Sequence, residues 1–80
     1  MFEFKDKIVV VTGGAGGIGK CICEEFIKAG ATVCSIDVSE GGYFVGDIGD
    51  KNTLEEFAQR VAREYGRADF LINNAPPLNM

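Results

Sequence analysis

Apolar residues near the N-terminus form a short unbroken run, which is followed by a helical repeat. Residues 7–12 read Lys-Ile-Val-Val-Val-Thr, a β-branched run without polar alternation that is typical of a parallel strand buried on both faces. Apolar residues then recur at the three- and four-residue spacing of an amphipathic helix, namely Ile18, Cys21, Ile22, Phe26 and Ala29. We therefore predict a strand over 7–12 and a helix over 17–29, with Gly30 as its C-terminal cap.

A second helix is predicted from a clearer apolar pattern later in the chain. Its apolar positions follow the i, i+3, i+4, i+7 spacing of a buried helix face, namely Leu54, Phe57, Ala58, Val61, Ala62 and Tyr65. Asp50 is placed to cap the start of this helix, and Gly66 is placed to end it.

Three further apolar segments predict short strands, over residues 31–36, 43–45 and 68–72. The first of them stops at Asp37 and leads into a turn-rich connection at 39–42, and residues 73–77 break the last one. The connection after Asp37 is about five residues long, although parallel crossovers usually need about a dozen. We interpret it as an extended crossing from which the usual helix is missing.

The alternation of strands and helices predicts an α/β fold with a parallel sheet. Right-handed crossovers then give a Rossmann-type, three-layer, doubly wound arrangement with the spatial strand order 3-2-1-4 and the two helices on opposite faces. A ligand crevice is expected between strands one and four, at the carboxyl edge of the sheet.

Glycines crowd the link between the first strand and the first helix, where residues 12–19 read Thr-Gly-Gly-Ala-Gly-Gly-Ile-Gly. Gly13 would permit a tight turn, Gly17 a close approach of backbone to a pyrophosphate, and Gly19 close packing of helix on strand. The free N–H groups at the helix start favour an anionic ligand. We predict dinucleotide contacts from Gly13, Ala15, Gly16, Gly17, Ile18 and Gly19. The alternative is a flexible turn that binds nothing. Gly14 and Gly16 are expected to add conformational freedom to the segment.

The same segment also resembles a P-loop, because residues 14–20 match G-x-x-x-x-G-K. Cys21 stands where a Ser or Thr hydroxyl would ligate Mg²⁺, and a thiol is a poor ligand for so hard a cation. A nucleotidase, with Asp37 as a second acidic motif, therefore ranks last among the functions considered.

Asp37 closes the second predicted strand, 18 residues after Gly19. A carboxylate there would accept hydrogen bonds from the adenosine ribose hydroxyls and would repel a 2′-phosphate. Because no Arg lies near it in the sequence, we predict NAD as the cofactor and NADP as less favoured. The alternative is an acidic strand end that faces water.

Four motifs together resemble the short-chain dehydrogenase/reductase family, and they span essentially the whole chain: Thr12-Gly-x-x-x-Gly17-Ile-Gly19, Asp37, Gly46-Asp-Ile48 and Asn73-Asn-Ala75. The resemblance implies that Asp47 and Ile48 flank the adenine ring. It also implies that Asn73, Asn74 and Ala75 pass the cofactor ribose and brace the central strands. Without the family, Asp47, Asn73 and Asn74 are equally ordinary turn residues. The chain departs from the family pattern at Pro76, where Gly is usual, and in the missing helix after Asp37.

Catalysis in that family implies a tyrosine, a lysine four residues later and a serine. Here Asp47 lies four residues after Tyr43, and Asp69 lies four residues after Tyr65. We therefore assign no catalytic residue and interpret residues 1–80 as the N-terminal, cofactor-binding portion, with the catalytic portion and the substrate contacts absent. We expect no dehydrogenase activity from these residues alone. A dinucleotide-binding module without chemistry fits the same pattern.

Composition limits the partners and the location. A net charge of −4 disfavours nucleic acid, and no apolar run approaches the roughly 20 residues of a membrane span. The N-terminus has no signal-peptide pattern, so the cytoplasm is expected. The chain has no histidine, and Cys21 and Cys23 point to opposite sides of the predicted helix, so no metal site is predicted. We expect the cysteines to be reduced and packed as small apolar groups.

The last predicted strand, over 68–72, is apolar as an interior strand would be. Nothing in this chain is left to cover its far side, and an unpaired apolar edge favours association. We expect a homo-oligomer or other self-association, or a longer polypeptide that covers this strand.

Overall fold

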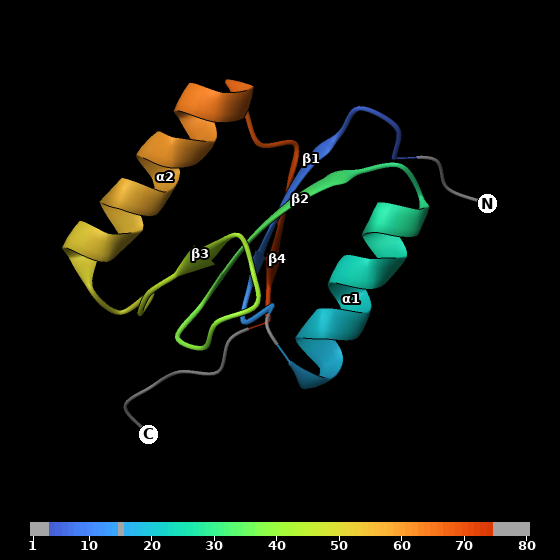
Figure 1. Cartoon of the computed structure of the whole chain (residues 1–80). Coiled ribbons are helices and arrows are strands. Elements are labelled where there is room, and N and C mark those ends of the chain that lie inside the picture. The colour runs from blue at the N-terminus through green and yellow to red at the C-terminus, as the bar shows by residue number, and fades with distance from the viewer. Residues whose placement is uncertain (1–3, 15, 75–80) are drawn as a thin grey trace.

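Six elements follow one another in the predicted order. The computed structural model describes residues 4–14 and 16–74. The elements are β1 (Ile8–Thr12), α1 (Gly17–Lys28), β2 (Thr32–Asp37), β3 (Phe44–Val45), α2 (Lys51–Tyr65) and β4 (Phe70–Asn73). Figure 1 shows the strands between the two helices. They pair in parallel in the order β3-β2-β1-β4, which confirms the predicted Rossmann-type topology.

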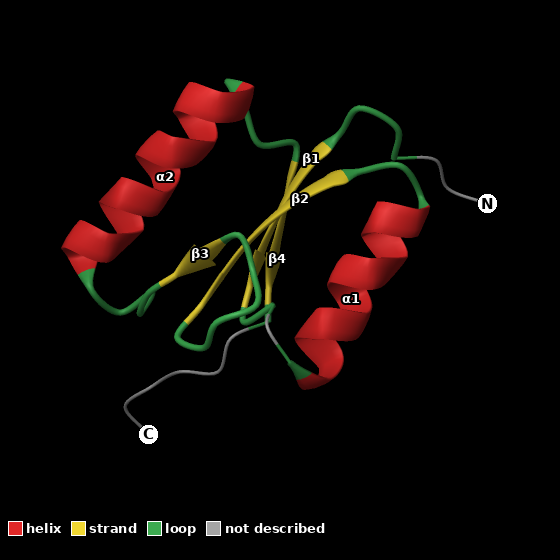
Figure 2. Ribbon diagram, in the orientation of Figure 1, coloured by secondary structure: helices red, strands yellow, loops and turns green. Residues whose placement is uncertain are grey.

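The centre of the sheet is β1, which is buried along its whole length, as its unbroken apolar run predicts. Alternate side chains point to opposite faces, and each face has its own core. Ile8 and Val10 pack with Phe57 and Val61 on the α2 side. On the α1 side, the core consists of Val9, Val11, Cys23 and Ala31. The two helices therefore cover opposite faces of the sheet, as Figure 2 shows.

Both ends of α2 are formed by the residues that the sequence indicates. One carboxylate oxygen of Asp50 accepts hydrogen bonds from the backbone N–H groups of Asn52 and Thr53, at 2.9 and 3.3 Å. Gly66 has a φ of 78°, in the left-handed region that favours glycine, and its N–H bonds back to Val61 and Ala62.

At its C-terminal end, α1 finishes one residue earlier than predicted, in a Schellman motif. Gly30 has a φ of 98°, and its N–H donates to the carbonyl of Ile27. The N–H of Ala31 donates to the carbonyl of Phe26, which completes the motif.

The predicted buried face of α1 is wrong in one respect. Cys23, outside the predicted stripe, is buried, whereas Ile18 and Cys21 are exposed. The two cysteines do point to opposite sides, as predicted. The helix is rotated about its axis because its first turn lies against the glycine turn described below, a tertiary contact that periodicity does not contain.

The apolar stripe of α2 is wider than the part of the sheet that it covers. Only Phe57 and Val61 are buried. Leu54, Ala58 and Ala62 border a groove of about 490 Å³ between α2 and the β1–β4 pair, whose apolar lining also includes Val10 and Leu71. The groove exists because α2 packs over β1 and β2 and leaves Leu71 of β4 exposed beside it.

At the end of the sheet where it begins, β4 is fixed by Asp69. The carboxylate of Asp69 accepts a hydrogen bond of 2.8 Å from the backbone N–H of Ile8 and pairs with Arg67. These interactions, the backbone bond first, lower the pKa of the Asp69 carboxyl. The observed strand covers Phe70–Asn73 and so begins later than predicted. It also includes Asn73, which the sequence analysis placed in the break after the strand.

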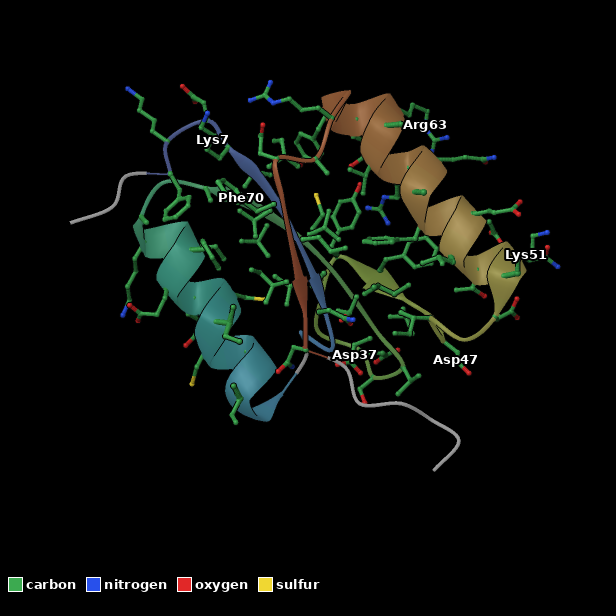
Figure 3. The ribbon with its side chains drawn as sticks, turned by 180° about the vertical axis from the view of Figure 1, so that it is seen from behind. Lys7, Asp37, Asp47, Lys51, Arg63 and Phe70 are labelled. Carbon is green, nitrogen blue, oxygen red and sulfur yellow. The ribbon has the colours of Figure 1, made fainter. Side chains whose placement is uncertain are left out.

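At the edge of the described sheet, β4 leaves large apolar side chains exposed. Leu71 is 68% exposed and Phe70 is 42% exposed. In Figure 3 this strand lies in front of the other strands, and Phe70 lies on its α1 side. Across residues 4–14 and 16–74, no helix is long and apolar enough to cross a membrane.

Candidate cofactor-binding site

All candidate residues that the structure describes lie at the carboxyl edge of the sheet. Because the strands are parallel, the ends of β1, β2, β3 and β4 meet at this edge. Asp37 and Asp47 lie at the same end of the sheet, below the core in Figure 3. Ala15 and Ala75, which the sequence analysis also proposed, lie outside the described residues, as does Pro76.

The turn after β1 depends on two glycines that have different roles. Gly13 has a φ of 74°, and its N–H donates a 2.8 Å hydrogen bond to the carbonyl of Ile36 in β2. Gly14 is buried, and a Cβ there would lie 2.7 Å from the Cβ of Ser35 and 3.0 Å from the Sγ of Cys23. The prediction that Gly14 adds only conformational freedom is wrong, because its missing side chain lets the turn lie against β2.

Gly19 brings the first turn of α1 against the glycine turn. A Cβ on Gly19 would overlap the carbonyl oxygen of Gly13 and would lie 2.7 Å from the Nδ2 of Asn74. Close packing at this glycine was predicted against a strand. The structure shows close packing against the turn carbonyl and an asparagine side chain instead. A glycine there holds α1 close to the ends of both β1 and β4.

The beginning of α1 is bare, in that no side chain of the described residues covers it. Gly17 has a φ of 58°, and a Cβ on Gly16 or Gly17 would meet no atom within 4 Å. The helix has no side-chain cap and no acidic residue in its first turn, and Ile18 is 73% exposed. Among residues 4–14 and 16–74, no side chain or carboxylate therefore competes with an anion for the partial positive charge of the helix N-terminus.

Thr12 links the end of β1 to the end of β4 at this edge. Its hydroxyl donates to the Oδ1 of Asn73 at 2.9 Å and accepts from the backbone N–H of Asn74 at 3.0 Å. The Nδ2 of Asn74 donates to the carbonyl of Gly13 at 3.0 Å. Asn73 and Asn74 thus brace the central strands. This contribution of Thr12 was not predicted, and its place at the strand end was the available signal.

Asp37 ends β2 half-buried, beside the glycine turn. One of its carboxylate oxygens accepts a 3.0 Å hydrogen bond from the N–H of Ser39, and its backbone carbonyl accepts from Gly46 at 2.8 Å. The backbone carbonyl of the neighbouring residue Ile36 accepts from the N–H of Gly13, so the end of β2 lies next to the segment that leads into α1. The side chain is therefore held in place before any ligand arrives.

Asp47 and Ile48 lie in the turn between β3 and α2. The carboxylate of Asp47 accepts a 2.8 Å hydrogen bond from the N–H of Gly49, so this residue does act as a turn former. Both residues are half-buried. Ile48 packs against the core on the α2 side and also lines the groove, where it forms an apolar wall near Thr12 and Asn73.

Neither tyrosine lies where it could act on a substrate at the carboxyl edge. Tyr43 donates a hydrogen bond of 2.6 Å from its hydroxyl to Glu64 on α2. Burial, together with this bond, raises the pKa of Tyr43 to about 12. Tyr65 is the last residue of α2, at the opposite end of that helix from the site.

The arrangement fits a dinucleotide. The bare helix start suits a pyrophosphate, and the carboxylate at the end of β2 suits a pair of ribose hydroxyls. Ile48 adds an apolar surface on the same edge. These are the parts needed to bind such a cofactor, and they come from three different connections.

The comparisons with known proteins agree with this geometry. The family model described as short chain dehydrogenase matches residues 7–78. Zerumbone synthase of Zingiber zerumbet is 34% identical, over 91% of this chain and 33% of its own length. The 3-oxoacyl-[acyl-carrier-protein] reductase of Thermotoga maritima is 32% identical, over 91% of this chain and 36% of its own. The chain thus spans about a third of the length of these relatives.

Solved structures show the same fold. The ligand-free aldohexose dehydrogenase of Thermoplasma acidophilum superposes with a TM-score of 0.82 at 28% identity, over 90% of this chain and 30% of its own. A short-chain dehydrogenase/reductase mutant of Serratia marcescens gives a TM-score of 0.82 at 27% identity, over 96% of this chain and 38% of its own. This chain belongs to the short-chain dehydrogenase/reductase family, whose cofactor is a nicotinamide dinucleotide.

Proposed function

We propose that this chain is the NAD(H)-binding part of an oxidoreductase that, as a complete enzyme, transfers a hydride between nicotinamide and an alcohol or carbonyl substrate. The observation that carries the proposal is the pairing of a bare helix start at Gly16 and Gly17 with the Asp37 carboxylate on the same sheet edge. The first would hold the pyrophosphate and the second the adenosine ribose.

NAD(H) is preferred over NADP(H) in this proposal because of charge. A 2′-phosphate would have to lie against the Asp37 carboxylate, and two like charges in contact repel. Binding the unmodified ribose instead lets the same carboxylate accept hydrogen bonds, which are strong when the acceptor is charged. Asp47 and Ile48 would flank the adenine.

The described residues bind and orient; they do not move a proton. The nicotinamide group supplies the hydride chemistry when it is bound. The Thr12–Asn73–Asn74 network keeps the ends of β1 and β4 together, so that the bound dinucleotide meets a rigid edge. The proton-transfer group and the substrate contacts would come from the remainder of a complete enzyme. A binding module without chemistry is the second candidate, because neither tyrosine begins a Tyr-x-x-x-Lys motif.

Calorimetric titration of the purified chain with NADH, NADPH and ATP with Mg²⁺ tests the proposed function. We expect NADH to bind more tightly than NADPH, because of the Asp37 charge, and ATP to bind more weakly than either. Tightest binding of Mg²⁺-ATP would instead support the P-loop alternative. Equal affinity for NADH and NADPH would contradict the proposed cofactor preference, and binding of neither would overturn the dinucleotide site.

We also propose that the 80-residue chain associates with a second copy through β4. Leu71 is 68% exposed on this edge strand, and the groove beside it is lined mostly by apolar side chains. An exposed apolar edge is a surface on which another strand can pair. Replacing Leu71 with Lys should weaken self-association about tenfold or more, because a lysine on an edge strand opposes pairing.

Sedimentation equilibrium across a range of concentrations measures this effect. Ile27→Lys is the matched control, since Ile27 is also exposed, at 57%, but belongs to α1 and not to the edge strand. A wild-type chain that stays monomeric, or an equal effect of both substitutions, would show that β4 is not the contact surface.

A further inference from the structure

The connection from β2 to β3 is short and contains no helix, yet it ends on a residue with an unusually complete set of contacts. Residues 38–43 form bends, and the last of them is Tyr43. Its N–H donates to the Oγ of Ser35 at 3.1 Å, and its carbonyl accepts from the Nη1 of Arg60 at 3.0 Å. Its hydroxyl donates to Glu64 at 2.6 Å. Both backbone groups and the hydroxyl are therefore bonded, to two different elements.

The Tyr43 ring is held as well. The guanidinium of Arg60 lies over it, 4.2 Å from the ring centre, and the Nε of Arg60 pairs with Glu64 at 3.1 Å. Each member of this cluster thus contacts the other two. An isolated Arg–Glu pair that is more than a third exposed contributes little. Here the pair also fixes an aromatic ring and a backbone carbonyl, so the three residues act as one unit.

The protonation states of Tyr43 and Glu64 favour the hydrogen bond between them. Burial and the bond to Glu64 raise the pKa of Tyr43 to about 12, so its hydroxyl keeps its proton at neutral pH. The bonds from Tyr43 and Arg60, in that order, lower the pKa of Glu64. A neutral donor therefore faces a charged acceptor, which makes the hydroxyl bond a charge-assisted one.

What Tyr43 holds is the segment next to the proposed adenosine site. Phe44 and Val45 follow it directly and pair with Ile36 and Asp37. The N–H of Gly46 then donates to the carbonyl of Asp37. Asp47 and Ile48 come next. The proposed adenine contacts therefore follow Tyr43 within a few residues, and the proposed ribose contact, Asp37, lies on the strand that pairs with β3.

We propose that Tyr43, Arg60 and Glu64 are positioning residues that set the Asp37 carboxylate and the Asp47–Ile48 segment for the adenosine end of the dinucleotide. The inference rests on the proposed function. The cluster replaces the rigidity that a helix would give to this connection, because it ties the far end of a helix-free loop to α2. In this role the three residues would not contact the dinucleotide and would act through the position of the carboxylate.

The test compares Tyr43→Phe and Glu64→Gln with Glu56→Gln, which changes an exposed acid on the same helix. The readout is the ratio of the dissociation constants for NADPH and NADH, measured by calorimetry on chains whose circular dichroism shows them folded. We expect both cluster variants to weaken NADH binding about threefold to tenfold, which corresponds to the loss of one hydrogen bond, and to change NADPH binding less. The ratio should therefore fall, while Glu56→Gln leaves it unchanged.

A merely structural role predicts a different result. Loss of folded protein weakens both ligands by the same factor and leaves the ratio at the wild-type value, so an unchanged ratio in both cluster variants would overturn the inference. Tyr43→Phe keeps the ring under Arg60, so its effect should be smaller than that of Tyr43→Ala. If the wild-type chain bound neither dinucleotide, the proposed function would fail first, and the inference with it.

Discussion

Replacing Gly19 with Ala should abolish measurable NADH binding and lower the melting temperature by about 5–20 °C. A Cβ at this position overlaps the backbone carbonyl oxygen of Gly13 and lies 2.7 Å from the Nδ2 of Asn74. A flexible side chain could move away, but a turn carbonyl can move only with its backbone. The helix must therefore shift, at a cost of about 1–3 kcal/mol or more. That shift also moves the helix start from the place where it would receive a pyrophosphate.

Gly16→Ala is the matched control for Gly19→Ala. Gly16 has an extended backbone with a φ of −158°, which any residue adopts, and a Cβ there would meet no atom within 4 Å. Thermal melts followed by circular dichroism should therefore show Gly16→Ala close to wild type. Equal melting temperatures for the two variants would mean that α1 does not depend on its close approach to the turn.

The strand order could be predicted because it follows from local patterns and from handedness. The β-branched run of β1, the helical spacing in α1 and α2, and right-handed crossovers leave few alternatives. The caps at Asp50 and Gly66 could be predicted for the same reason, since each acts within a few residues of its own position. Such features depend on residues that are close together in the sequence.

The rotation of α1 could not be predicted in this way. Spacing placed Cys21 on the buried face, but the structure buries Cys23. The difference comes from Gly14 and Gly19, whose missing side chains let the turn and the helix approach β2 and the ends of β1 and β4. Periodicity indicates that a helix has an apolar face. Contacts with distant elements decide how far the helix turns around its axis.

In the candidate site, too, local features could be predicted and contacts between distant residues could not. Asp37 could be placed because the end of a strand is a local feature, and the apolar run of β2 stops at this residue. The bond from Tyr43 to Glu64 joins residues 21 positions apart and depends on the path of a helix-free connection. The role of Thr12 depends on β4 lying beside β1. These contacts appear only after the sheet has formed, so no spacing rule indicates them.

Replacing Asp37 with Ala should weaken NADH binding about tenfold to a hundredfold, because charge-assisted hydrogen bonds to the ribose contribute about 1.5–3 kcal/mol. NADPH should be affected less or should gain, since the repulsion of its 2′-phosphate disappears with the charge. Calorimetric titration of both nucleotides measures the two effects separately.

Asp37→Asn separates the charge from the shape at this position. The asparagine keeps an oxygen that can accept from Ser39, so the turn after β2 should persist while the negative charge is lost. If charge sets the preference, Asn should bring NADPH close to NADH as Ala does, with a smaller loss of NADH affinity. Glu40→Gln removes an exposed charge three residues away and should change neither constant. An unchanged NADPH-to-NADH ratio in both Asp37 variants would mean that the carboxylate does not face the ribose, and the proposed cofactor preference would then have no physical basis.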